Sequence, residues 1–149
     1  TPPTRFVVVG SPGYLRARGR PAEPQDLDGH ACIGWRAPSS GALYRWELSC
    51  RGEEREITPA GPLFCDETEL MVAGALDGLG LAYLPELAIA EHLAARRLVP
   101  VLESWAASGP GLCVYFPRRA QGSPKLRAFL DVVHAQRRAA RRPAPRKGR

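Results

Sequence analysis

Short apolar runs in this sequence are repeatedly followed by turn and helix-start residues, and this alternation restricts the fold more than any other feature. The first run, Phe6 to Val9, is continuous and rich in β-branched residues, which is typical of a strand buried on both faces. Ser11 and Pro12 follow it, and a serine before a proline favours the start of a helix. The sequence therefore predicts a strand, a turn and a helix in this order.

The same alternation continues along the chain. Further strands are predicted over residues 31–35, 62–65, 81–85 and 112–116, with an extended segment over 98–102. Helices are predicted over residues 12–18, 24–29, 66–76, 85–95 and 124–133. Residues 44–48 and 54–58 flank Arg51-Gly52, which indicates a β-hairpin. Strands that alternate with helices, with one hairpin inserted, predict an α/β fold with a mixed sheet.

Length and charge give further information about the domain and its C-terminal tail. The 149 residues, 44% of them hydrophobic, suit one globular domain with a core. The net charge of +6 is concentrated in residues 137–149, which hold seven basic residues and no acid, so the rest carries 14 basic and 15 acidic residues, a net charge of −1. We expect this basic tail to be disordered, and binding of nucleic acid through its charge is the alternative.

Other classes of protein are disfavoured by what the sequence contains. No run approaches the ~20 apolar residues of a membrane helix, so no membrane partner is expected. The first residue is not Met and no secretory signal opens the chain, so we expect a fragment of a cytoplasmic protein. The four cysteines are scattered without C-x-x-C spacing, and the three histidines are isolated. No metal site or cofactor is therefore predicted, and the thiols are expected to be reduced.

Ser11 is the one residue that invites a catalytic interpretation. A nucleophile elbow has the pattern G-x-S-x-G, but here Val9 stands two residues before the serine. Pro12 has no N–H, so it cannot supply the oxyanion-hole donor that follows such a nucleophile. We therefore predict that Ser11 is a helix cap and that the chain has no catalytic residue, while a serine hydrolase fragment stays as an alternative.

A binding site is better supported than a catalytic one. Phe64, Cys65 and Asp66 end a predicted strand and begin a helix, and ligands of open α/β sheets bind at the carboxyl ends of strands. Ser11 and the segment Tyr83 to Pro85 lie at junctions of the same kind. We expect these strand ends to meet at one rim and to form half of a small-molecule cleft. The three tryptophans are expected in the core or in the cleft wall.

The order of these segments resembles the effector-binding domain of LysR-type transcriptional regulators. The residues that carry the resemblance are Ser11-Pro12-Gly13-Tyr14-Leu15, Gly19-Arg20-Pro21, Asp26-Leu27, His30 and Cys32-Ile33 near the start, Trp46 and Asp66 in the middle, and the stretches AGALDGLGLAYLPELAIAEHLAARRLVPVLESW and GLCVYFPRRAQGSPKLRAFLDVV. No single motif among them is specific, but their order over residues 6–134 is.

The resemblance implies a periplasmic-binding-protein-like fold of type 2, in which two α/β lobes enclose a ligand cleft. Residues 6–102 would form the second lobe, and residues 112–136 would be the strand and helix that return to the first lobe. Residues 137–149 would be the basic disordered tail. The two-lobe domain would thus be incomplete in this chain, and the chain alone would bind ligand weakly.

The resemblance also implies a function. The chain would be the effector-sensing and oligomerisation part of a LysR-type regulator, with no enzymatic activity and with DNA bound through a helix-turn-helix absent from this chain. The effector would be a small molecule, for which an organic acid is one candidate class. The alternative outside this family's role is the solute-binding lobe of a transport protein. Candidate ligand-binding residues are Ser11, Phe64, Cys65, Asp66, Glu67, Tyr83 and Pro85, and candidate dimer contacts are Glu69, Leu70, Ala73 and Gly74.

Overall fold

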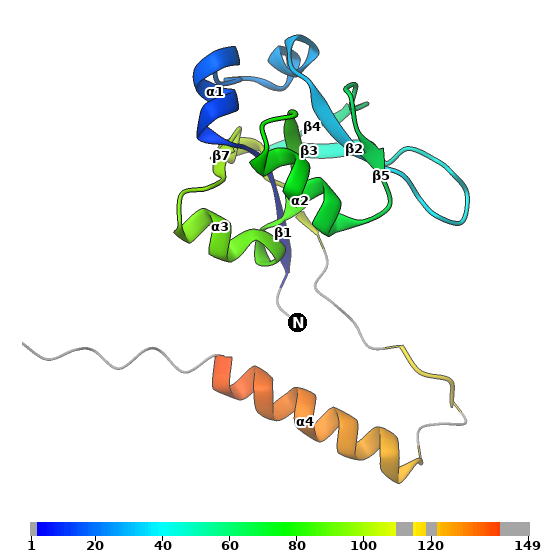
Figure 1. Ribbon diagram of the computed structural model, residues 1–149. Coiled ribbons are helices and arrows are strands. Elements are labelled where there is room, and N and C mark those ends of the chain that lie inside the picture. Colours follow the sequence, from blue (N-terminus) through cyan, green and yellow to red (C-terminus); the bar gives the residue numbers. More distant parts are fainter. Residues whose placement is uncertain (1–2, 110–114, 119–121, 141–149) are drawn as a thin grey trace, which may run out of the picture. The chain divides into compact units, whose positions relative to one another are not determined.

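The computed structural model describes residues 3–109, 115–118 and 122–140 (Figure 1). The chain divides into two compact units, one formed by residues 3–110 and the other by residues 111–149 with residues 1 and 2.

The first unit is built on one mixed sheet. Its strands follow the order β5-β2-β6-β1-β7, and β8 pairs with β1 beyond that path. Strands β5 and β6 both run parallel to β2, whereas β1 runs antiparallel to β6, β7 and β8. The strands are β1 (Thr4–Gly10), β2 (Cys32–Trp35), β5 (Phe64–Cys65), β6 (Leu81–Pro85), β7 (Val99–Val101) and β8 (Ser108–Gly109). The mixed α/β sheet predicted from the sequence is confirmed.

Both faces of this sheet are buried, which explains why the strand sequences are continuously apolar rather than alternating. In β1, Val7 and Val9 point to one face and Val8 to the other, because successive side chains of a strand alternate. In β6, Tyr83 shares a face with Val8, and Leu84 shares the opposite face with Val7 and Val9.

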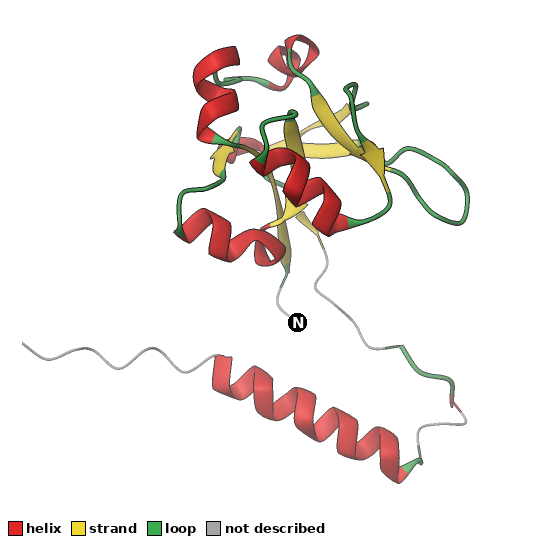
Figure 2. Ribbon diagram, viewed as in Figure 1, coloured by secondary structure: helices red, strands yellow, loops and turns green. Residues whose placement is uncertain are grey.

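Each face is covered by different elements (Figures 1 and 2). Helix α2 (Thr68–Leu76), the 3-10 turn η2 (Glu86–Ile89) and helix α3 (Ala90–Ala94) cover the face of Val7 and Val9. The hairpin formed by β3 (Trp46–Cys50) and β4 (Glu53–Ile57) covers the other face, together with α1 (Pro12–Arg18) and two short 3-10 turns, η1 (Pro24–Gly29) and η3 (Glu103–Trp105).

The hairpin is held to the sheet by aromatic packing. Trp46 and Leu48 are each about 1% exposed, and the Trp46 ring stacks on that of Tyr83 at a centroid distance of 5.7 Å. The turn places Arg51 at φ 51° and Gly52 at φ 86°, the left-handed region that a two-residue hairpin turn requires. The predicted hairpin is therefore confirmed.

The structure differs from the sequence predictions at three places. The segment predicted as one helix over residues 85–95 is divided into η2 and α3, because Pro85 still belongs to strand β6 and Ala90 begins a new helix. The short strand β8 was not predicted, since two residues carry no periodic pattern. In the strand predicted over residues 112–116, residues 112–114 lie outside the described residues, and Tyr115 and Phe116 are not in a strand.

The second unit contains helix α4 (Pro124–Ala140). It begins after Ser123, as predicted, but it extends seven residues beyond the predicted end at Val133. Residues 137–140 of the predicted disordered tail are therefore helical, and residues 141–149 lie outside the described residues. Leu126, Phe129, Leu130 and Val133 give the helix an apolar stripe of the predicted kind.

Among the described residues, no helix is long and apolar enough to cross a membrane.

The close approach of two chain segments at Gly80 provides a test of the fold. A Cβ atom at Gly80 would overlap the backbone of Ala31, whose carbonyl accepts a 2.8 Å hydrogen bond from the Leu81 N–H. We expect Gly80→Ala to lower the free energy of unfolding by about 1–3 kcal/mol, the usual cost of overpacking. Gly29→Ala, where a Cβ meets nothing within 4 Å, should change it by less than about 0.5 kcal/mol. Urea denaturation of both variants checks this, and equal effects would contradict the packing described.

Candidate functional site

A hollow of about 340 Å3 opens at the edge of the sheet where β1 begins and β6 ends. Because β1 is antiparallel to β6, Phe6 pairs with Pro85 across this edge. Strands β2 and β5 end at the same edge, because they run parallel to β6. The residues lining the hollow, called the aromatic pocket below, are Phe6, Trp35, Tyr44, Thr68, Met71, Tyr83, Leu84 and Pro85.

Four aromatic rings from four parts of the chain form its walls. The rings of Phe6 and Tyr83 lie 5.3 Å apart, and those of Trp35 and Tyr44 meet edge to face at 6.3 Å. Such distances are typical of favourable aromatic pairs. None of the eight lining side chains is charged, so the pocket presents ring faces and a few hydroxyl groups.

The two tyrosine hydroxyls of the pocket remain protonated at neutral pH. Tyr83 donates a 2.6 Å hydrogen bond to the carbonyl oxygen of Glu47, and burial raises the pKa of Tyr83 well above its usual range. Burial also raises the pKa of Tyr44, and Glu47 acts in the same direction on both phenols. Both hydroxyls, with that of Thr68, are therefore neutral hydrogen-bonding groups rather than bases.

The end of β5 is tied to the pocket by its backbone. The indole N–H of Trp35 donates to the carbonyl oxygen of Asp66 at 3.1 Å. The Cys65 thiol lies 3.6 Å from the carbonyl oxygen of Glu67. These contacts fix the turn that leads from β5 into α2, and Thr68, the first residue of α2, lines the pocket.

The structure brings most of the predicted ligand-binding residues to this edge. Tyr83 and Pro85 line the aromatic pocket. Phe64, Cys65 and Asp66 lie at the same edge, at the end of β5 and just beyond it, but are not among the lining residues, and neither is Glu67, the N-cap of α2. Their role in binding stays a prediction.

Ser11 does not share this edge, so the expectation of three strand ends at one rim was wrong. The reason is the direction of β1: it runs antiparallel to β6, and its carboxyl end lies at the opposite edge of the sheet. A larger hollow of about 730 Å3 is found there, lined by Ser11 and Tyr14 and by the basic side chains of Arg16, Arg18 and Arg97.

Six lining residues were not selected as site residues from the sequence. Trp35 ends strand β2, so the rule of strand carboxyl ends would have found it, and the sequence did place the tryptophans in the core or a cleft wall. Thr68 and Met71 follow the predicted junction on α2 within one turn. Leu84 lies in the segment Tyr83 to Pro85, which the sequence did place at a strand end. Nothing in the sequence marks Phe6 or Tyr44, because their place depends on the antiparallel pairing of β1 and on the path of a loop.

The predicted dimer contacts on α2 divide between two faces of the helix. Glu69, Leu70 and Ala73 are exposed. Gly74 is buried instead, and a Cβ there would lie 2.9 Å from a methyl group of Leu63. Its prediction as a dimer contact was wrong, because it lies three residues after Met71 and shares the core-facing side of the helix.

The cysteines and the acidic residues form no other site within the described residues. No group of three or more His, Cys, Asp or Glu side chains that could hold a metal ion occurs there. Cys32 is 1% exposed, and burial raises the pKa of its thiol to about 11. It therefore behaves as a small apolar core residue. Cys113 lies outside the described residues.

Comparison with known families decides what kind of domain this is. Residues 3–138 match the family described as the LysR substrate binding domain. The chain belongs to this family.

Relatives and solved structures of this family agree with that assignment. The uncharacterized HTH-type transcriptional regulator YcaN of Escherichia coli K12 is 38% identical over 132 residues, which cover 89% of this chain and 42% of YcaN. The regulatory domain of CrgA from Neisseria meningitidis, a LysR-type transcriptional regulator, is 28% identical, with a TM-score of 0.71 over 88% of this chain and 64% of that one. The regulatory domain of AphB from Vibrio vulnificus is 25% identical, with a TM-score of 0.70 over 90% of this chain and 64% of that one.

The periplasmic-binding-protein-like fold of type 2 is therefore confirmed for this LysR substrate-binding domain. The chain spans less than half the length of YcaN and of the other HTH-type regulators it matches. Those relatives are transcriptional regulators and not enzymes or transport proteins, so the hydrolase and transport alternatives are not favoured.

Local geometry at Ser11 agrees with the non-catalytic interpretation of this LysR substrate-binding domain. Ser11 is 6% exposed, and its Oγ accepts a 3.3 Å hydrogen bond from the Tyr14 N–H, so it is the N-cap of α1, as predicted. The nearest histidine in sequence, His30, contacts the Tyr14 hydroxyl through Nδ1 at 3.1 Å. Its bond is thus made to a phenol and not to the serine.

Ser11→Ala tests this assignment. We expect the loss of about 1 kcal/mol of stability, the usual cost of removing a serine N-cap, and no change in turnover of p-nitrophenyl acetate above the uncatalysed rate. Ser39→Ala, at an exposed loop serine, is the matched control and should change stability by less than about 0.5 kcal/mol. Thermal unfolding and an esterase assay measure both, and esterase turnover that disappears in Ser11→Ala alone would contradict the cap assignment.

Proposed function

We propose that this chain is the part of a LysR-type transcriptional regulator that senses a small-molecule effector, and that the effector binds in the aromatic pocket. The observation that carries the proposal is the pocket's position. It is the hollow at which β2, β5 and β6 end, and in open α/β sheets ligands bind at the carboxyl ends of strands. Membership of the LysR substrate binding domain family supports it independently.

The pocket is suited to a flat, largely apolar ligand. Aromatic side chains supply large contact areas, and the lining is formed mainly by rings and by the apolar residues Met71, Leu84 and Pro85. The Thr68 and Tyr44 side chains add hydroxyl groups that can orient a polar substituent. Phe64, Cys65, Asp66 and Glu67, which border this edge, complete the proposed set of ligand contacts.

Regulation would follow from differential binding. In the intact regulator, DNA would be bound through a helix-turn-helix outside this chain, and several copies would assemble. An effector that binds one arrangement of the copies more tightly than another shifts their populations, and the shift is limited by that difference in affinity. The chain would then have no enzymatic role and would act in the cytoplasm, where the DNA is.

Assembly of copies is proposed to use the exposed face of α2. Leu70 is 49% exposed, and Glu69 and Ala73 lie beside it on the same face. An exposed leucine next to a small residue provides an apolar surface that a helix of a second copy can approach closely. Gly74, which faces the core, takes no part.

The first test of the proposed site replaces Trp35, which forms one wall. We expect Trp35→Phe to weaken binding of the neutral probe 2-phenylethanol severalfold, because the smaller ring gives less contact and loses the hydrogen bond to Asp66. Trp105→Phe, at a half-buried tryptophan outside the pocket, should leave the affinity unchanged. Amide chemical-shift titrations in two-dimensional NMR, followed at Thr68 and Leu84, give both dissociation constants.

Weak binding is expected from a chain that supplies part of a cleft, so the titration extends to about 10 mM probe, near the upper end of measurable dissociation constants. Shifts confined to Thr68, Leu84 and their neighbours would support the pocket. If 2-phenylethanol shifts no resonance of the pocket, the proposed site is wrong.

The second test concerns assembly. We expect Leu70→Glu to reduce self-association of the chain, because a charge on that face opposes the approach of a second apolar surface. Leu79→Glu is the matched control, since Leu79 is 46% exposed and lies beyond the C-terminal end of α2. Sedimentation velocity over a range of concentrations measures the association constants, and an equal loss in both variants would argue against the α2 face.

A further inference from the structure

We propose that the aromatic pocket selects an aromatic ligand that carries a positive charge, such as an arylalkyl ammonium group, over an organic acid of the same shape. This inference rests on the proposed function, since it concerns the ligand of the same pocket. It follows from how the fold distributes ionised groups around the four rings.

The rings themselves favour a cation. The faces of Trp, Tyr and Phe rings carry negative potential, and a cation within about 6 Å of a ring centroid is attracted to it. Trp35, Tyr44, Tyr83 and Phe6 all line the pocket, and no positively charged residue is among the lining side chains. A ligand carboxylate would therefore meet ring faces and no cation.

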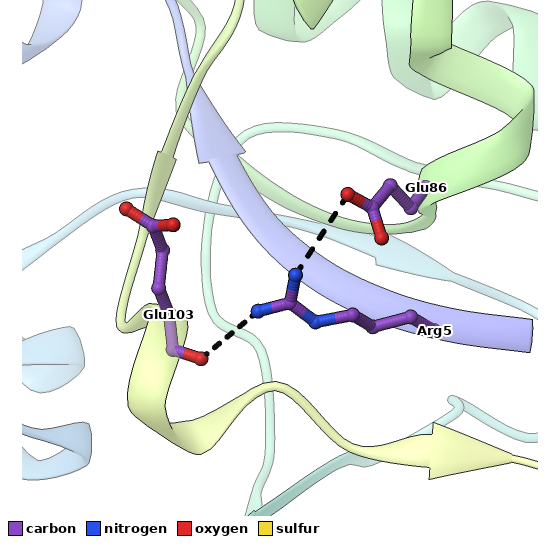
Figure 3. A network of polar contacts seen from close by, with 3 residues as sticks. All are labelled: Arg5, Glu86 and Glu103. Atoms are coloured by element: carbon purple, nitrogen blue, oxygen red, sulfur yellow. Dashed lines mark hydrogen bonds and ion pairs between the residues drawn. The ribbon is translucent and has the colours of Figure 1, made fainter.

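Arginines do stand next to three of these rings in the sequence, but each is directed to another partner. Arg5, beside Phe6, lies 3.8 Å from the Glu86 carboxylate and donates to the Glu103 carbonyl oxygen at 3.2 Å (Figure 3). Since consecutive residues of a strand point to opposite faces, Arg5 points away from the face of Phe6. The Arg5 guanidinium is thus held by acceptors outside the pocket lining.

The other two arginines also have partners outside the pocket lining. Arg36, beside Trp35, donates to the Gly41 carbonyl oxygen at 2.8 Å and lies over the Phe64 ring at 5.8 Å. Arg45, beside Tyr44, is paired with Glu56 at 3.1 Å. Arg5 and Arg45 are thus paired with carboxylates, whereas Arg36 keeps its charge and is directed to a backbone carbonyl and to the Phe64 ring, which is not among the lining residues.

Carboxylates around the pocket are left unbalanced. Asp66, Glu67 and Glu69 flank Thr68 and are exposed, and no ion pair in the described part of the chain includes them. They also lie at the start of α2, where their charge offsets the positive end of the helix that would otherwise favour an anion. An anionic ligand at Thr68 would meet like charges on both sides.

Glu47 adds a fourth carboxylate on the hairpin side. It acts on the hydroxyls of both Tyr44 and Tyr83, raising the pKa of each. The backbone carbonyl of Glu47 accepts the 2.6 Å hydrogen bond of the lining residue Tyr83, so the Glu47 residue lies beside the pocket although it is not among the lining residues.

The experiment compares three probes of nearly equal size with the full chain: 2-phenylethylammonium, 2-phenylethanol and 3-phenylpropionate. The Trp35 indole N–H resonance, identified by its loss in Trp35→Phe, reports on the pocket because that N–H lies in its wall. We expect the ammonium probe to bind about tenfold more tightly than the carboxylate, with the neutral probe between them. The ratio should fall as salt is added, because exposed charges are screened.

The outcomes separate this inference from the proposed function. If 3-phenylpropionate binds as tightly as the ammonium probe or more tightly, while 2-phenylethanol still binds, the charge selectivity is wrong and the pocket remains. If none of the three probes shifts the Trp35 resonance, the pocket itself is wrong.

A charge-neutralising variant then tests the cause of the selectivity. Glu47→Gln should reduce the ammonium-to-carboxylate ratio about two- to threefold, since it removes one of four carboxylates. Glu54→Gln removes the same charge from the other strand of the hairpin, outside the pocket lining, and should leave the ratio unchanged. An unchanged ratio in Glu47→Gln would overturn the proposal, because the preference would not come from this field.

Discussion

The antiparallel pairing of β1 with β6 is the interaction on which the rest of this structure depends. It joins a strand from the start of the chain to the middle of an otherwise parallel set, with Val9 and Ala82 paired and fully buried. The pairing also sets what lies at each edge of the sheet. Phe6 comes to the edge where β2, β5 and β6 end, and the helix start at Ser11 is carried to the other edge. The aromatic pocket and the Ser11 helix cap therefore lie at opposite edges of the sheet.

Tyr83 links this pairing to the proposed binding site. Its ring stacks on Trp46 of the hairpin and lies 5.3 Å from Phe6, and its hydroxyl holds the carbonyl of Glu47. One side chain of β6 thus contacts the core, the hairpin and the pocket. A ligand that packs on Tyr83 touches the residue that fixes the hairpin on the sheet, so the position of β3 and β4 and the shape of the pocket depend on the same contacts.

Much of the fold could be predicted from sequence because its determinants are local. The apolar run of β1, the cap at Ser11 and the turn at Arg51-Gly52 each depend on a few neighbouring residues. The direction of β1 relative to β6 is not local. A strand buried on both faces shows the same continuous apolar pattern in either orientation, so the sequence could not tell whether Ser11 lies at the rim. The rule of strand ends selected the edge of the aromatic pocket through Phe64 to Asp66, Tyr83 and Pro85, but it missed Tyr44, which reaches the pocket from a loop.

The net charge of the chain also says little about the charge around the pocket, which depends on where the fold places each charged side chain. The chain carries a net charge of +6, yet seven of its basic residues are in the last thirteen positions. Near the pocket, Arg5, Arg36 and Arg45 are close in sequence to lining residues and would make the region appear basic if charges were counted along the chain. Their guanidinium groups bind acceptors outside the pocket lining, so in the proposed site the unpaired carboxylates at the start of α2 are the charges closest to Thr68. The charge preference of such a pocket therefore depends on which of the neighbouring arginines and carboxylates are paired with each other. Membership of the family reflects the fold and does not by itself determine the charge of the ligand.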